Sequence, residues 1–210
     1  MTRSISLFAA VILLTSGAQA SHIDLVTDGV FSVGGTSIVV EGNPDSILGG
    51  ARRVGTSFTN AVLSRSAPND FIAYRNTSGL SATATLEYGD FAGGNGPLNA
   101  DLTGGWNSIA IDVRRVVGLG QLRVEFEAGG EAANASSIAI SAAGLYHVDF
   151  NQSGLRTVDF SDIDRIAIRI LGANGTEFDI GPITLSTVPA PAATGLAATA
   201  GLALNRRRRR

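Results

Sequence analysis

Residues 120–127 read Gly-Gln-Leu-Arg-Val-Glu-Phe-Glu, and this stretch decides the fold class. Leu122, Val124 and Phe126 are apolar, and the residues that alternate with them are charged. Successive side chains of a β-strand point to opposite faces, so one face of this segment is apolar and the other is wet. The pattern predicts a half-buried strand of an antiparallel sheet.

Other segments of the chain have a similar strand-like character. They are residues 36–41, 80–88, 106–113, 136–141, 165–171 and 176–185. Gly, Asn, Asp and Pro separate them, and no segment has the 3.6-residue period of an amphipathic helix. Many short strands with Gly-rich turns predict an all-β fold, an antiparallel β-sandwich of jelly-roll topology over residues 21–187.

Large apolar side chains are the expected core of this sandwich. The phenylalanines predicted to be buried are Phe31, Phe58, Phe126, Phe150, Phe160 and Phe178.

The N-terminal 20 residues have the order of a secretory signal peptide. Arg3 supplies positive charge, residues 5–14 are apolar, and Ala18-Gln19-Ala20 forms an A-x-A cleavage site. The apolar run is shorter than the roughly 20 residues that span a bilayer. We therefore expect signal peptidase to remove residues 1–20 and leave Ser21 as the new terminus.

The C-terminal residues 188–210 have three consecutive parts. Val188, Pro189, Ala190 and Pro191 come first, and a short apolar segment, 192–204, follows. The chain then ends in Arg206, Arg207, Arg208, Arg209 and Arg210. A positive cluster stays on the cytoplasmic side, so the sequence predicts a short hydrophobic helix that enters the inner membrane transiently. A simple membrane anchor is the alternative.

This tail resembles the PEP-CTERM sorting signal, in which a Pro-Glu-Pro motif precedes an apolar helix and an Arg cluster. Ala190 stands where that family usually has Glu. The resemblance implies cleavage by an exosortase-type membrane enzyme and display on the cell surface or in the extracellular matrix. Residues 46–53 and 82–88 are similar to the globular part of such proteins. Residues 158–166 and 178–183 resemble galactose-binding-like jelly rolls, including carbohydrate-binding modules.

Charge and cysteine content exclude several kinds of function. The whole chain has a formal net charge of -2, but residues 21–187 hold ten arginines against 18 acids, which gives -8. An acidic domain is repelled by phosphate backbones, so nucleic acid is not expected as a partner. The chain has no cysteine, which excludes thiolate metal sites and Cys nucleophiles.

Acidic side chains are the candidate metal ligands, because Ca²⁺ prefers carboxylate oxygens. Asp159, Asp162 and Asp164 are closely spaced in sequence. The jelly-roll resemblance implies a second calcium site, to which Asp24, Asp28 and Asp179 would contribute. Solvated faces and turn caps are the alternative interpretation.

Two further groups of side chains are candidates for catalysis or ligand binding. His147 and Asp149 are two residues apart and would share a strand face, but no Gly-x-Ser-x-Gly nucleophile elbow accompanies them. No catalytic residue is therefore predicted. Trp106 is a candidate sugar platform, and a core position is its alternative role.

These features predict an exported, non-enzymatic protein of the cell surface or polysaccharide matrix. A carbohydrate-binding module is the first alternative, and a secreted hydrolase is the second. The partners expected are signal peptidase, an exosortase-type enzyme and exopolysaccharide, with structural calcium as the one cofactor considered.

Overall fold

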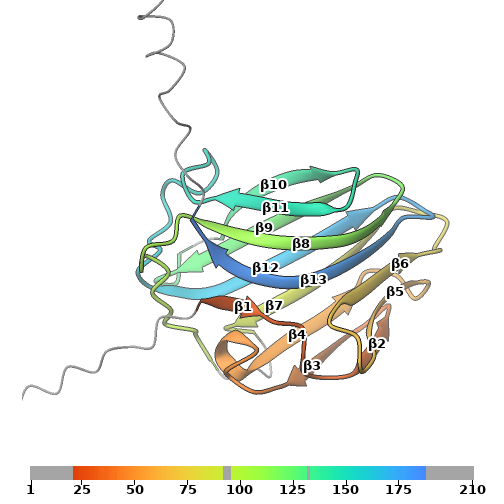
Figure 1. Ribbon diagram of the computed structural model, residues 1–210, viewed down its shortest axis with the longest axis horizontal. Coiled ribbons are helices and arrows are strands. Elements are labelled where there is room, and N and C mark those ends of the chain that lie inside the picture. The colour runs from red at the N-terminus through yellow and green to blue at the C-terminus, as the bar shows by residue number, and fades with distance from the viewer. Residues whose placement is uncertain (1–20, 92–95, 132, 188–210) are drawn as a thin grey trace, which may run out of the picture.

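The alternating segments form two antiparallel sheets, which Figure 1 shows one layer behind the other. The computed structural model describes residues 21–91, 96–131 and 133–187. The strands within these residues are β1 (His22–Asp24), β2 (Phe31–Gly34), β3 (Ser37–Glu41), β4 (Ala51–Thr56), β5 (Ala61–Arg65), β6 (Ile72–Asn76), β7 (Ala82–Gly89), β8 (Ser108–Val117), β9 (Gly120–Ala128), β10 (Asn134–Ile140), β11 (Gly144–Asp149), β12 (Ile163–Gly172) and β13 (Glu177–Ser186). A single 3₁₀ turn, Leu48–Gly50, precedes β4.

The strand order within the sheets is that of a jelly roll. Sheet A has the order β11-β8-β13-β6-β5-β2, with β1 also paired to β13. Sheet B has the order β10-β9-β12-β7-β4-β3. From β6 to β13 the chain crosses to the other sheet after every strand except β9, which is the two-sheet winding of a jelly roll. The predicted fold class is confirmed.

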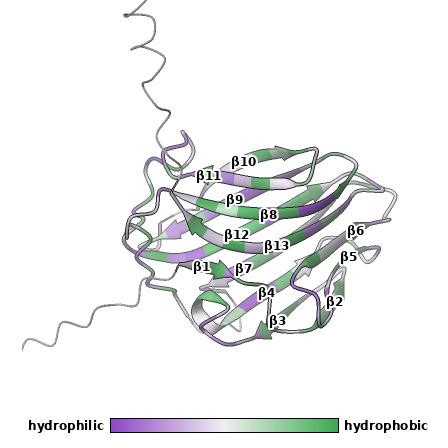
Figure 2. Ribbon diagram, viewed as in Figure 1, coloured by the Kyte–Doolittle hydropathy of each residue, from purple (hydrophilic) through white to green (hydrophobic). Residues whose placement is uncertain are grey.

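The core lies between the sheets and is built from the apolar positions of each strand. Hydrophobic and hydrophilic positions alternate along the strands in Figure 2. Leu122, Val124 and Phe126 of β9 are fully buried. Phe126 meets Phe150 and Phe160 edge to face, with ring centroids 5.9 and 5.1 Å away.

Phe58 is an exception among the phenylalanines predicted to be buried, because 40% of it is exposed. It lies between β4 and β5, where the chain passes from sheet B to sheet A over the surface. A residue in such a connection has no opposing sheet to pack against, so the prediction of a core position was wrong.

The predicted signal peptide (1–20) and sorting segment (188–210) lie outside the described residues. Within the described part of the chain, no helix is long and apolar enough to cross a membrane.

Candidate ligand-binding groove

The outer face of sheet B carries an open groove of about 840 Å³. Its floor follows one row of directly paired residues that crosses five strands. The row runs from Arg123 on β9 through Arg169 on β12, Thr85 on β7 and Gly55 on β4 to Ser37 on β3. The side chains of Arg123, Arg169, Thr85 and Ser37 point away from the core, because the neighbours in their strands point inward, and Gly55 occupies the same face without a side chain. The jelly-roll pairing therefore brings five distant segments into one polar surface.

The centre of the groove is lined by small residues, so side chains do not fill it. A Cβ atom on Gly55 would approach the Cβ of Ser37 to 2.9 Å and the carbonyl oxygen of Thr36 to 3.0 Å. The first contact is closer than real Cβ atoms show and the second is tighter than most, so the close approach of β3 to β4 favours glycine at position 55. Hydroxyl groups of Thr36, Ser57 and Thr83 line the groove at this end.

The first of two ionic clusters at the groove has equal numbers of positive and negative side chains. We call Arg53, Glu87, Arg165 and Glu127 the balanced cluster. Arg53 binds one carboxylate oxygen of Glu87, and the Nη1 of Arg165 lies 3.1 Å from the other. The Nε of Arg165 donates to Glu127 at 2.8 Å. Two cations thus meet two anions, and Glu87 is only 5% exposed.

A second ionic cluster lies at the β9–β12 end of the groove and does not balance. We call Arg123, Glu125 and Arg169 the cationic cluster. The Nε atoms of Arg123 and Arg169 lie 2.9 and 3.0 Å from the two carboxylate oxygens of Glu125. Two guanidinium groups share one carboxylate, so the cluster has a formal charge of +1 on a domain whose total is -8.

Glu87 and Glu125 are the two carboxylates of the groove lining. They flank Ala167 on the two neighbouring strands, so they are the candidate acid–base pair of the groove. All four of their oxygens face a guanidinium group. Each carboxylate therefore holds two arginine side chains in place.

Asp24, one of the predicted calcium ligands, is buried in a different network. It forms a fully buried ion pair with Arg52, and the hydroxyl of Tyr88 donates to its Oδ2 at 2.9 Å. Burial, together with the nearby Asp24 carboxylate, raises the pKa of Tyr88 well above its ordinary value. The tyrosine therefore remains a hydrogen-bond donor to Asp24.

Asp28, the next predicted ligand, holds a loop together. Its Oδ2 accepts hydrogen bonds from the Ser46 hydroxyl and from the backbone N–H of Asn43, the latter at 2.8 Å. These bonds, the one from Ser46 above all, lower the pKa of Asp28. Arg65 fills the space beside this loop and donates to the carbonyl oxygens of residues 26, 27 and 29.

The remaining predicted calcium ligands have separate partners. Asp179 accepts from Arg75 at 2.6 Å, Asp159 from the backbone and hydroxyl of Ser161, and Asp164 from the backbone of Gly130. Asp162 is exposed. Among the described residues, no three His, Cys, Asp or Glu side chains are arranged to hold a metal ion. Calcium binding stays a prediction, and a melting temperature unchanged by EDTA would contradict it.

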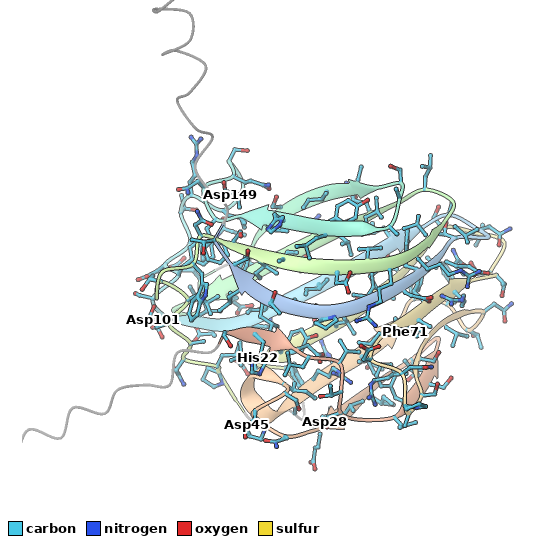
Figure 3. All side chains as sticks on the ribbon, in the orientation of Figure 1. His22, Asp28, Asp45, Phe71, Asp101 and Asp149 are labelled. Carbon is cyan, nitrogen blue, oxygen red and sulfur yellow. The ribbon has the colours of Figure 1, made fainter. Side chains whose placement is uncertain are left out.

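The other candidate residues lie away from the groove. His147 and Asp149 are on β11 of sheet A, and Asp149 accepts from the backbone N–H of Asn151 at 2.7 Å. Figure 3 places Asp149 at the opposite edge of the molecule from Asp28. Trp106 lies just before β8, is half-buried and packs against the core.

Most of the groove residues were missed by sequence reasoning. Arg123 and Glu125 were predicted to lie on a wet strand face; both lie on the outer face of sheet B, but Arg123 is exposed and Glu125, which pairs with two arginines, is only 7% exposed. No sequence pattern indicated that Thr85, Gly55 and Ser37 line a groove. The available signal was the charge on the outward positions of residues 165–171, which is the strand now seen to pair with β9.

Comparison with known proteins shows likeness in fold alone. No protein-family model matches the chain, and no curated protein matches its sequence. Among solved structures, TmCBM61 in complex with β-1,4-galactotriose is 12% identical, with 65% of this chain and 88% of that one covered and a TM-score of 0.41.

Two further solved structures extend this comparison. The family 11 carbohydrate-binding module of a cellulosomal cellulase of Clostridium thermocellum is 16% identical, covers 84% of this chain and 99% of its own, and has a TM-score of 0.41. An exo-β-agarase is 16% identical with a TM-score of 0.47, and the match spans 64% of this chain and 24% of the enzyme. At these values the likeness does not bear on what this chain binds.

Proposed function

We propose that this chain is an exported, non-enzymatic protein that binds a hydrophilic polysaccharide in the groove of sheet B. The observation that carries the proposal is the polar row from Arg123 to Ser37. With strands about 4.8 Å apart, a row across five strands is roughly 19 Å long, which accommodates several consecutive sugar rings rather than one small molecule. The groove volume also lies in the range of ligand sites.

The lining of the groove favours a ligand rich in hydroxyl groups. Hydroxyls of Ser37, Thr83 and Thr85 can donate and accept, and the guanidinium groups of Arg123 and Arg169 only donate. None of the described lining residues is aromatic. Binding would therefore depend on hydrogen bonds and charge, and not on the stacking of apolar sugar faces.

The absence of catalysis is part of the proposal and rests on the engagement of Glu87 and Glu125 by arginines. A secreted hydrolase would need one of these carboxyl groups to carry a proton in the groove. Calcium, if bound, would have a structural role at the acids away from the groove.

The location of the protein outside the cell is the other part of the proposal. Export and exosortase-type sorting, with exopolysaccharide as the partner outside the cell, depend on segments 1–20 and 188–210. A mature protein that begins at Ser21 and ends within residues 188–191 would support this location. An intact mass that still includes Arg206 to Arg210 would contradict it.

Electrophoresis of the protein through gels that contain single polysaccharides tests the binding proposal. We expect retardation by at least one polysaccharide, and loss of that retardation in Thr85→Tyr, which fills the centre of the row. Thr184→Tyr is the matched control, because Thr184 is a half-buried threonine on β13 of sheet A. Unretarded migration in neutral and acidic polysaccharides alike would overturn the proposal.

A further inference from the structure

Arg123 and Arg169 stand directly opposite each other on neighbouring strands. Directly paired residues of an antiparallel sheet have Cβ atoms about 5 Å apart, and like charges at that distance destabilise the sheet. Glu125 offsets the charge of only one of them. The sheet therefore holds an unneutralised positive charge at one end of the groove, which calls for a reason other than stability.

The two arginines also have unused donors. The Nε of each lies within 3.0 Å of Glu125, although the Nε of Arg169 is buried and makes no hydrogen bond, and no terminal nitrogen of either donates a hydrogen bond to the described residues. Arg53 and Arg165 of the balanced cluster, by contrast, each use terminal nitrogens on Glu87. The side chains of Arg123 and Arg169 are 49% and 37% exposed, so their free edges are accessible from the groove.

We propose that the cationic cluster binds an anionic substituent of the sugar chain, so that the ligand is an acidic polysaccharide. This inference rests on the proposed function. A guanidinium group presents two parallel N–H donors, which match the two oxygens of a uronate carboxylate or of a sulfate ester. Glu125 holds the Nε side of each arginine and leaves the terminal donors directed to the ligand.

The acidic remainder of the domain does not oppose this binding. At physiological ionic strength, charges more than about 8 Å from the ligand are largely screened. The charge of the cationic cluster itself therefore dominates the electrostatic attraction of an anionic ligand to the groove. The acids elsewhere on the surface disfavour polyanions at other places, which confines binding to the groove.

Matched polysaccharide pairs test the inference. Polygalacturonate and its methyl ester have the same backbone, and only the first carries free carboxylates. Dextran sulfate and dextran form the corresponding pair for sulfate. We expect tight binding of the charged member of at least one pair and about tenfold or weaker binding of its neutral partner, the size of one lost hydrogen bond to a charged group. The pair that responds identifies the anionic group.

Two variants connect the effect to the cationic cluster. Arg123→Gln and Arg169→Gln are each expected to weaken binding of the charged polymer about tenfold or more, and by a larger factor than binding of its neutral partner, because Gln still donates to hydroxyl groups but has no positive charge. Arg115→Gln is the control, because Arg115 lies on β8 of sheet A and its side chain is 50% exposed, close to the 49% of Arg123.

The outcomes separate this inference from the proposed function. Equal binding of charged and neutral members, abolished by Thr85→Tyr, would overturn the anionic ligand and leave polysaccharide binding in place. No binding of any polymer would overturn both. Charge-dependent binding that survives both Arg123→Gln and Arg169→Gln would place the anion elsewhere and overturn the assignment to the cationic cluster.

Discussion

Two pairs of arginines in this molecule are used in opposite ways. Arg52 and Arg65 are buried, and their donors are directed to Asp24 and to backbone carbonyl oxygens of the loop that follows β1. Arg123 and Arg169 lie on the outer face of sheet B, share one carboxylate and keep their terminal donors free. Every side-chain nitrogen of the first pair except the Nε of Arg52 has a hydrogen-bond partner inside the protein, whereas the terminal nitrogens of the second pair have none among the described residues.

The difference shows how burial decides the role of a charged side chain. Leaving the donors of a buried guanidinium group without partners is costly, and Arg52 leaves only its Nε without one. Arg65 donates to three carbonyl oxygens, although burial lowers its pKa. A half-exposed guanidinium group can leave donors to water, and therefore to a ligand. We expect the buried pair to control stability and the exposed pair to control binding.

The largest expected effect is on the buried pair. Arg52→Met leaves the carboxylate of Asp24 buried without its cationic partner, which typically costs about 3–5 kcal/mol in the free energy of unfolding. Urea denaturation measures the loss. The double variant Asp24→Leu/Arg52→Met should recover much of it, because an apolar pair can replace a buried ion pair. A loss below about 1 kcal/mol in Arg52→Met would contradict this role.

A smaller effect is expected from Asp28 in the same loop. The hydrogen bonds from Ser46 and Asn43 lower the pKa of Asp28 below 3.8, so they stabilise the folded state above that pH and less as the pH falls through the lowered pKa. Asp28→Asn should be less stable than the parent at neutral pH, and the difference should shrink in acid. Thermal melting of both proteins against pH measures it, and a difference independent of pH would refute the assignment.

The smallest expected effect on stability is at the cationic cluster. Arg123→Gln removes one of two opposed cations and leaves Glu125 paired with Arg169, so the free energy of unfolding should change by no more than about 0.5 kcal/mol. Thermal melting checks this in the same preparation that is used for the binding assay. Destabilisation as large as that of Arg52→Met would mean that Arg123 has a structural role, and the contrast between the two pairs would fail.

The fold was predictable where alternation was clean. Residues 120–127 and 165–171 fall within β9 and β12, and the predicted segment 176–185 overlaps β13 from Glu177 onward. Strands β4, β5 and β6 were not predicted. Each contains an inward polar residue that breaks the apolar pattern, namely Arg52, Arg65 and Asn76. Each has partners distant in sequence, which are Asp24 on β1 for Arg52, the loop that follows β1 for Arg65, and the carbonyl oxygens of residues 172 and 173 for Asn76, so the local pattern does not indicate that these side chains are buried.

The candidate site was predictable only in part. The sequence predicts that Arg123 and Glu125 face away from the core, because that follows from the two-residue period of one strand. It does not predict that Arg169, Thr85 and Gly55 lie beside them, since strand order depends on pairing between segments far apart in the chain. Five of the six acids predicted to bind calcium have different partners and Asp162 is exposed, which sequence spacing does not reveal.

By itself, the sequence determined the all-β class with its jelly-roll sandwich, the outward face of residues 120–127 and the acidic character of residues 21–187. These properties depend on composition and on the local period of the strands, which the linear order contains. Only the tertiary structure decided which arginines are buried and which face the groove. The second group results from the pairing of β9 with β12, β12 with β7 and β7 with β4. This pairing places the balanced cluster and the cationic cluster on one face of sheet B.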